Sequence, residues 1–129
     1  MSADLGFTPA DRTENIRRIG EVAKLFADAG VVVITAFISP YRDDRNRVRT
    51  IAPDQFHEVF IKADLSTCET RDPKGLYAKA RNGEIEDFTG VSAPYEEPTD
   101  ANLIIDTGAQ HIDQSVSKLL DYVSLNFKS

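Results

Sequence analysis

Apolar residues recur at helical spacing at both ends of the chain. Thr8-Pro9 has the form of a helix start, and Ile16, Ile19 and Phe26 follow at that spacing up to Gly30, so residues 9–29 are predicted to be helical. Shorter helices are predicted over residues 41–51, from Asp64 or Ser66 to Glu69, and over 75–81. A last helix is predicted from one apolar face, formed by Ile112, Val116, Leu119, Leu120 and Val123.

Three apolar segments lie between these helices. Residues 31–37 are largely β-branched and apolar without alternation, which predicts a parallel strand buried on both faces. Residues 56–63 and 102–106 are predicted as further strands, and 83–100 as a long loop. Helices that alternate with buried strands predict an α/β fold with a parallel sheet. Ligands bind at the carboxyl ends of such strands, where Ser39-Pro40, Asp64 and residues 106–108 fall.

Length and charge narrow the function classes. The 129 residues fit one domain, the longest apolar run is too short to span a bilayer, and residues 1–25 lack a signal-peptide pattern, which predicts a cytoplasmic protein. A net charge of −6 disfavours nucleic acid and anionic membranes as partners. Residues 42–81, however, hold nine Lys/Arg against seven Asp/Glu. This segment suits a small anionic ligand, although by itself a solvated face of mixed charge is the simpler interpretation.

Five sequence motifs, taken together, resemble those of a known enzyme family. The segments "DLGF" (4–7), "DRTENIRR" (11–18), "FISPYR" (37–42), "CETRDPKGLYAKAR" (68–81) and "FTGVSAPYEEP" (88–98) together resemble the adenylylsulfate kinases of the P-loop kinase group. The resemblance implies a three-layer α/β/α P-loop fold. It also implies transfer of the γ-phosphate of ATP to the 3′-hydroxyl of adenosine 5′-phosphosulfate (APS) in sulfate assimilation. The product is 3′-phosphoadenosine 5′-phosphosulfate (PAPS), and the cationic stretch after Ser39 would face these polyanions.

The resemblance also implies cofactors and partners. ATP would enter with Mg²⁺ bound through nucleotide oxygens, and the expected assembly is a homodimer with possible fusion to, or association with, ATP sulfurylase. Cys68, His57 and His111 are scattered along the sequence and predict no protein metal site.

One element of the family pattern does not occur in these 129 residues, which contain no GxxxxGK[ST] loop. Residues 1–129 are therefore expected to be the C-terminal two-thirds of a kinase domain, with residues 68–98 as lid and substrate loop. This form is expected to be inactive alone, with apolar surface exposed on Val31 to Phe37. Two alternatives stay open: a non-catalytic sulfonucleotide-binding module, and an α/β interaction subunit.

Site residues follow from the resemblance. Phe7 and Phe88 would sandwich the substrate adenine, although each could be a core residue. Arg12, Asn15 and Arg18 would contact the phosphosulfate and ribose, although a solvated helix surface is the simpler interpretation. The remaining substrate contacts would come from Ile38, Ser39, Thr89 and Lys74.

Two residues receive catalytic roles and four receive ATP contacts. Lys74 would reach the transferring phosphates, and Ser39 is considered as a phosphoryl acceptor, although no adjacent histidine in the sequence would activate it. The ATP contacts would be Arg71, Thr107, Gly108 and Gln110.

Overall fold

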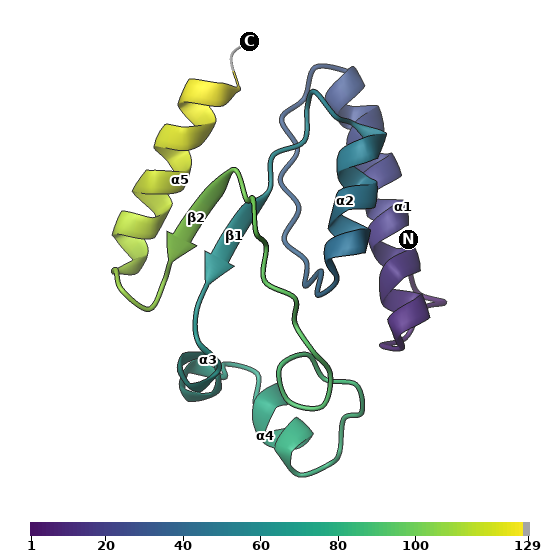
Figure 1. Ribbon diagram of the computed structural model, residues 1–129, viewed down its shortest axis with the longest axis vertical. Coiled ribbons are helices and arrows are strands. Elements are labelled where there is room, and N and C mark those ends of the chain that lie inside the picture. Colours follow the sequence, from purple (N-terminus) through teal and green to yellow (C-terminus); the bar gives the residue numbers. More distant parts are fainter. Residues whose placement is uncertain (128–129) are drawn as a thin grey trace. The chain divides into compact units, whose positions relative to one another are not determined.

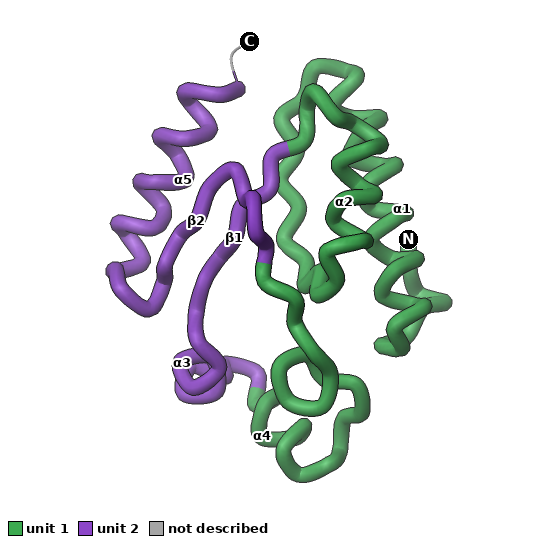
Figure 2. Tube along the Cα trace, in the orientation of Figure 1, with its two compact units in different colours: residues 1–56, 75–97 green, residues 57–74, 98–129 purple. Residues whose placement is uncertain are grey.

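The computed structural model describes residues 1–127, which divide into two compact units. Unit 1 comprises residues 1–56 and 75–97, and unit 2 comprises residues 57–74 and the chain from residue 98 (Figure 2). Each unit is therefore built from two separate stretches of sequence.

Unit 1 is built on two packed helices, α1 (Pro9–Asp28) and α2 (Arg42–Ile51), shown side by side in Figure 1. The Thr8 side chain accepts a hydrogen bond from the Asp11 N–H, so α1 begins where the sequence predicts. The helices approach closely at Gly20, where an added Cβ would lie 3.2 Å from the Val48 methyl groups. A short helix, α4 (Leu76–Arg81), belongs to the same unit.

Unit 2 contains two parallel strands, β1 (Val59–Lys62) and β2 (Leu103–Asp106), with Ile61 opposite Ile105. Phe60 and Ile105 are buried, Ile105 almost completely. The Lys118 ammonium of α5 (Ile112–Asn126) donates to the Ile104 carbonyl at 2.8 Å, which ties this helix to β2. The remaining helix, α3 (Leu65–Arg71), is capped by the Asp64 carboxylate, which accepts from the Thr67 N–H.

The prediction for residues 31–37 was wrong. Within the described residues 1–127 this segment joins no sheet, and the sheet has two strands where three were predicted. Its large apolar side chains are exposed, from 37% for Val33 to 74% for Ile34, so the expected exposure of apolar surface on this segment is confirmed. A β-branched apolar sequence favours an extended backbone, but a strand also needs a neighbour to complete its hydrogen bonds.

The other predicted elements are observed with shifts of a few residues at their ends. The apolar row of α5 stays largely exposed, however, at 69% for Ile112, 59% for Val116 and 63% for Leu120. Among the described residues, none of the helices combines the length and apolar character that a membrane crossing requires.

Candidate functional site

One arginine of α1 holds the two segments that carry the predicted adenine walls. Arg12 Nε donates to the Phe7 carbonyl at 3.0 Å, and its Nη2 donates to the Asp87 carbonyl, next to Phe88, at 2.9 Å. The guanidinium carbon also lies 5.7 Å from the centroid of the Phe7 ring, within cation–π range. A single side chain therefore links two aromatic residues that are 81 positions apart in sequence.

The two phenylalanines differ in exposure. Phe7 is 69% exposed, so it is not a core residue. Phe88 is half-buried and packs edge-on against Tyr77, with ring centroids 5.0 Å apart. An exposed ring and a half-buried ring on neighbouring segments offer apolar surface to a flat ligand, since purines stack well on aromatic faces.

A tight turn fixes Phe88. Its carbonyl accepts from the N–H groups of Val91, Ser92 and Ala93, and its own N–H donates to the Ser92 hydroxyl. The preceding Asp87 has a φ of 52°, which is uncommon for a residue with a side chain. Thr89 lies in the same turn, and its hydroxyl oxygen is buried without a hydrogen-bond partner among the described residues.

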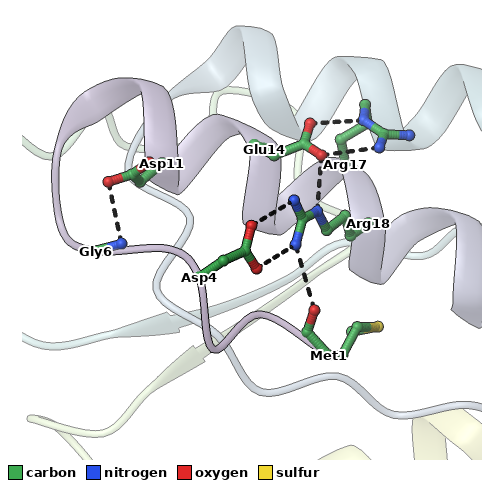
Figure 3. A network of polar contacts seen from close by, with 7 residues as sticks. All are labelled: Met1, Asp4, Gly6, Asp11, Glu14, Arg17 and Arg18. Atoms are coloured by element: carbon green, nitrogen blue, oxygen red, sulfur yellow. Dashed lines mark hydrogen bonds and ion pairs between the residues drawn. The ribbon is translucent and has the colours of Figure 1, made fainter.

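An ionic network anchors the segment before α1 (Figure 3). The Arg18 guanidinium donates to both carboxylate oxygens of Asp4, at 2.8 and 3.0 Å, and to Glu14 at 2.8 Å. Arg17 donates to Glu14 through two further nitrogens. The Gly6 N–H, next to Phe7, donates to Asp11 at 3.0 Å. The network thus secures the short segment that presents the Phe7 ring.

Hydrogen bonds from arginine shift the acid groups of this network. Those from Arg17 and Arg18 lower the pKa of Glu14 from 4.5 to about 2, and the one from Arg18 lowers the pKa of Asp4. The same contacts raise the pKa of Arg18. Arg18, predicted to contact the phosphosulfate, is therefore engaged with two carboxylates here, while Asn15 is half-buried on the same helix.

Three of the four arginines after Ser39 contact the chain itself. The cationic stretch was predicted to face the polyanionic substrates, but Arg45 is 7% exposed and donates to the carbonyls of Ser39 and Glu96, both at 2.5 Å. Arg42 Nε donates to the Glu97 carbonyl at 2.8 Å, and the Arg49 guanidinium lies over the Phe56 ring. These three side chains contact the protein's own groups. The prediction is wrong for the buried Arg45, and for Arg42 and Arg49 it stays a prediction.

The predicted pocket residues Ile38 and Ser39 lie just before α2, the helix that carries these arginines. Ile38 is 59% exposed and Ser39 is half-buried, while the following Pro40 is almost completely buried. The Pro40 carbonyl accepts from the Glu96 N–H at 2.8 Å. Sequence reasoning overlooked Glu96, and no local signal points to it, because its partners lie more than 50 positions away.

Unit 2 collects the residues predicted to contact ATP. Arg71 donates to the Thr107 carbonyl at 2.6 Å and to its hydroxyl at 3.1 Å, and that hydroxyl donates to the Lys62 carbonyl. The Asp106 carboxylate accepts from the N–H groups of Gly108 and Ala109, so Asp106 caps the turn after β2. Gln110 donates to Ser115 at 3.0 Å, and Lys74 is an exposed residue of the same unit.

The two histidines have structural partners. His57 Nδ1 lies 2.6 Å from the Tyr122 hydroxyl, and His111 caps α5. Across residues 1–127 there is no group of three or more His, Cys, Asp or Glu side chains that could hold a metal ion.

Comparison with known proteins gives a consistent result. The sequence profile described as adenylylsulphate kinase matches residues 1–106. An adenylyl-sulfate kinase of Bacillus licheniformis is 59% identical over 95% of this chain and 63% of its own length. One from Prochlorococcus marinus is 61% identical over 91% of this chain and 59% of its own length. The chain thus spans about three-fifths of these relatives.

A solved structure agrees. The Mycobacterium tuberculosis APS kinase CysC in complex with AMPPNP and APS matches 95% of this chain and 72% of its own, with 45% identity and a TM-score of 0.89. This likeness confirms the predicted α/β fold of the P-loop kinase type, which the parallel pairing of β1 and β2 also supports. Together with the profile match and the curated relatives, it means that the chain belongs to the adenylylsulphate kinase family.

Proposed function

We propose that this chain contributes the sulfonucleotide site to an enzyme that phosphorylates the 3′-hydroxyl of APS with ATP. The observation that carries the proposal is the Arg12 contact, because one guanidinium holds the segments of Phe7 and Phe88 together. The solved relative contains APS, a flat purine nucleotide with two negatively charged groups. Two aromatic surfaces next to an arginine suit that chemistry.

The other substrate contacts follow from their surroundings. Thr89 carries a buried hydroxyl without a partner among residues 1–127, which a nucleotide oxygen would satisfy. Ser39 acts in this proposal through its backbone or hydroxyl as a binding group, rather than as a phosphoryl acceptor. In this proposal Asn15, Arg18 and Ile38 would complete the contacts to APS.

Phosphoryl transfer depends on charge neutralisation. Lys74 is exposed, which suits a residue that reaches over the transferring phosphate when the lid closes. In this proposal the ATP base would bind beside the contact between Arg71 and Thr107, with Gly108 and Gln110 following Thr107 in sequence. In this proposal Mg²⁺ enters bound to ATP, since these residues present oxygen and nitrogen donors without a carboxylate cluster.

We further propose that a polypeptide of these 129 residues does not form PAPS by itself. In P-loop enzymes the backbone N–H groups and the lysine of GxxxxGK[ST] bind the β- and γ-phosphates. That motif does not occur in the 129 residues. The homodimer, the association with ATP sulfurylase and the cytoplasmic location remain predictions from the sequence.

The test measures PAPS formation by two purified polypeptides. One consists of the 129 residues, and the other carries in addition the phosphate-binding segment of the Bacillus licheniformis relative, joined before residue 1. We expect turnover from the second only, and loss of that turnover when the added loop lysine is changed to alanine. Turnover by the 129-residue chain would contradict the P-loop argument, and the absence of APS binding to either would contradict the proposed function.

A further inference from the structure

Arg45 lies at the junction of two segments that carry proposed substrate contacts. Its two terminal nitrogens donate to different carbonyls, Nη1 to Ser39 and Nη2 to Glu96, each at 2.5 Å. Ser39 lies near the end of the irregular segment before α2, and Glu96 lies in the loop between α4 and β2, which also contains Phe88. One guanidinium therefore sets the distance between these two segments.

Neighbouring contacts reinforce the same junction. The Glu96 N–H donates to the Pro40 carbonyl at 2.8 Å, and the Glu96 carboxylate accepts from the Arg42 N–H at 2.8 Å. The second contact caps α2, whose own N-cap residue Tyr41 provides no side-chain hydrogen bond. The helix that carries Arg45 thus begins at the loop that Arg45 holds.

Because Arg45 is buried, its guanidinium depends on hydrogen-bond acceptors within the chain. Arg45 is 7% exposed, and its guanidinium carbon lies 5.8 Å from the centroid of the Tyr95 ring. A buried guanidinium is costly unless its donors are satisfied, so its retention between two carbonyls requires both segments to stay in place. A lysine would keep the charge but has no planar fork to reach two separate carbonyls.

We infer that Arg45 is a positioning residue for the sulfonucleotide site, which sets Ser39 against the loop of Phe88 and Thr89 without touching the substrate. The inference rests on the proposed function, since the pocket it shapes is the APS pocket. In a positioning role, APS affinity depends on where the Arg45 guanidinium holds the two segments. In an electrostatic role, it would depend only on the positive charge of residue 45.

Three substitutions in the 129-residue chain separate these roles. Arg45→Met removes both the positive charge and the planar guanidinium, whereas Arg45→Lys keeps the charge and removes only the guanidinium. Arg47→Met removes the charge of an exposed arginine on the same helix. APS is titrated by calorimetry at a temperature where circular dichroism shows each variant folded. Hydrogen exchange of the Glu96 amide reports the junction without any ligand.

We expect Arg45→Lys and Arg45→Met to raise the dissociation constant of APS by about tenfold each and to speed exchange at Glu96, because small displacements of positioned groups weaken binding. Arg47→Met should change neither measurement by more than about twofold, as expected of a surface charge. APS binding by Arg45→Lys equal to that of the unaltered chain would overturn the inference.

Two safeguards keep the outcomes distinct. If the Arg45 variants do not fold, Glu96→Ala replaces them, because it removes the α2 cap at the same junction, while Glu96→Gln keeps the accepting oxygen as its control. Faster exchange of the amide at position 96, relative to the intrinsic rate of the residue there, and weaker APS binding in Glu96→Ala alone support the inference, and equal behaviour of the two variants overturns it. If the unaltered chain does not bind APS, the proposed function fails, and slower or unchanged Glu96 exchange in Arg45→Lys would then overturn the positioning role as well.

Discussion

Both units bury apolar side chains, Ile16 and Ile19 of unit 1 among them, but unit 1 also buries two neighbouring charged residues that are hydrogen-bonded within the chain. In unit 2 the apolar side chains of Phe60 and Ile105 are buried on neighbouring strands. In unit 1 the charged pair of residues Asp44 and Arg45 is buried on α2, where Asp44 accepts from the Thr13 hydroxyl at 2.9 Å and Arg45 donates to backbone carbonyls. Apolar burial contributes most to stability, whereas hydrogen-bonded charges fix specific distances.

This difference agrees with the proposal that APS binds mostly to residues of unit 1 and ATP to residues of unit 2. The residues proposed to bind APS are mostly in unit 1, on loops that need fixed positions, and those proposed to contact ATP are in unit 2, around the end of the sheet. We therefore expect substitutions in the apolar core of unit 2 to act mainly on stability. Substitutions at the arginine contacts of unit 1 should act mainly on APS affinity.

The largest effect on stability is expected from Ile105→Ala. Ile105 is 1% exposed, and loss of a buried aliphatic side chain costs about 2–5 kcal/mol through lost transfer energy and the cavity left behind. Chemical denaturation measures the free energy of unfolding. Ile104→Ala, on the same strand but 48% exposed, is the matched control and should cost clearly less. Equal losses would mean that the sheet is not the core of unit 2.

The largest effect on catalysis is expected from Lys74→Ala in the polypeptide that carries the added phosphate-binding segment. If its ammonium neutralises charge in the transition state, kcat and kcat/KM should fall together by about 10²–10³. Lys74→Arg should recover part of the loss. Lys79→Ala, another exposed lysine, is the control. An unchanged kcat with a raised KM for one nucleotide would make Lys74 a ground-state binding residue.

A smaller effect is expected from Phe88→Ala. Loss of one stacking surface should weaken APS binding by about 1–3 kcal/mol, by analogy with bases stacked on aromatic side chains, and leave ATP binding nearly unchanged. Calorimetry on the same polypeptide gives both affinities. Phe26→Ala, a 55% exposed phenylalanine of α1, is the control. If Phe88→Ala weakens both nucleotides equally, Phe88 serves packing and not recognition.

The smallest expected effect is that of low pH on the stability of the chain. The folded-state pKa of Glu14 is lowered to about 2 from an ordinary 4.5, so its stabilising contribution is complete above about pH 4.5 and is lost as pH falls through about 2. Glu14→Gln should remove this part of the pH dependence of the melting temperature, whereas Glu86→Gln, an exposed residue of unit 1, should not. Identical pH profiles for the unaltered chain and Glu14→Gln would show that the Arg17–Glu14–Arg18 network does not stabilise α1.

The sequence predicted the helices and strands of both units except for one segment of unit 1, and this exception has a physical reason. The strands over 59–62 and 103–106 follow from local apolar pattern, and the caps Thr8 and Asp64 follow from local hydrogen bonding. Residues 31–37 have the same apolar pattern, yet they form no strand, because pairing depends on a second segment that a local pattern does not contain.

The candidate site shows the same limit. The motifs singled out Phe7, Arg12 and Phe88, which the structure links through Arg12. The contacts of Arg42 and Arg45 could not be predicted, because their acceptors are backbone carbonyls, which every residue has, and most lie over 50 positions away. The four arginines within ten residues were interpreted as a surface for an anionic ligand, although three of them contact the chain itself.

The central claim, that unit 1 forms a sulfonucleotide site through Phe7, Arg12 and Phe88, is tested most directly by calorimetric titration of the 129-residue chain with APS and, separately, with ATP. We predict saturable binding of APS, much weaker binding of ATP, and loss of APS binding in a chain that carries both Phe7→Ala and Phe88→Ala. Binding of APS that survives the double substitution, or ATP binding as tight as that of APS, would contradict the account.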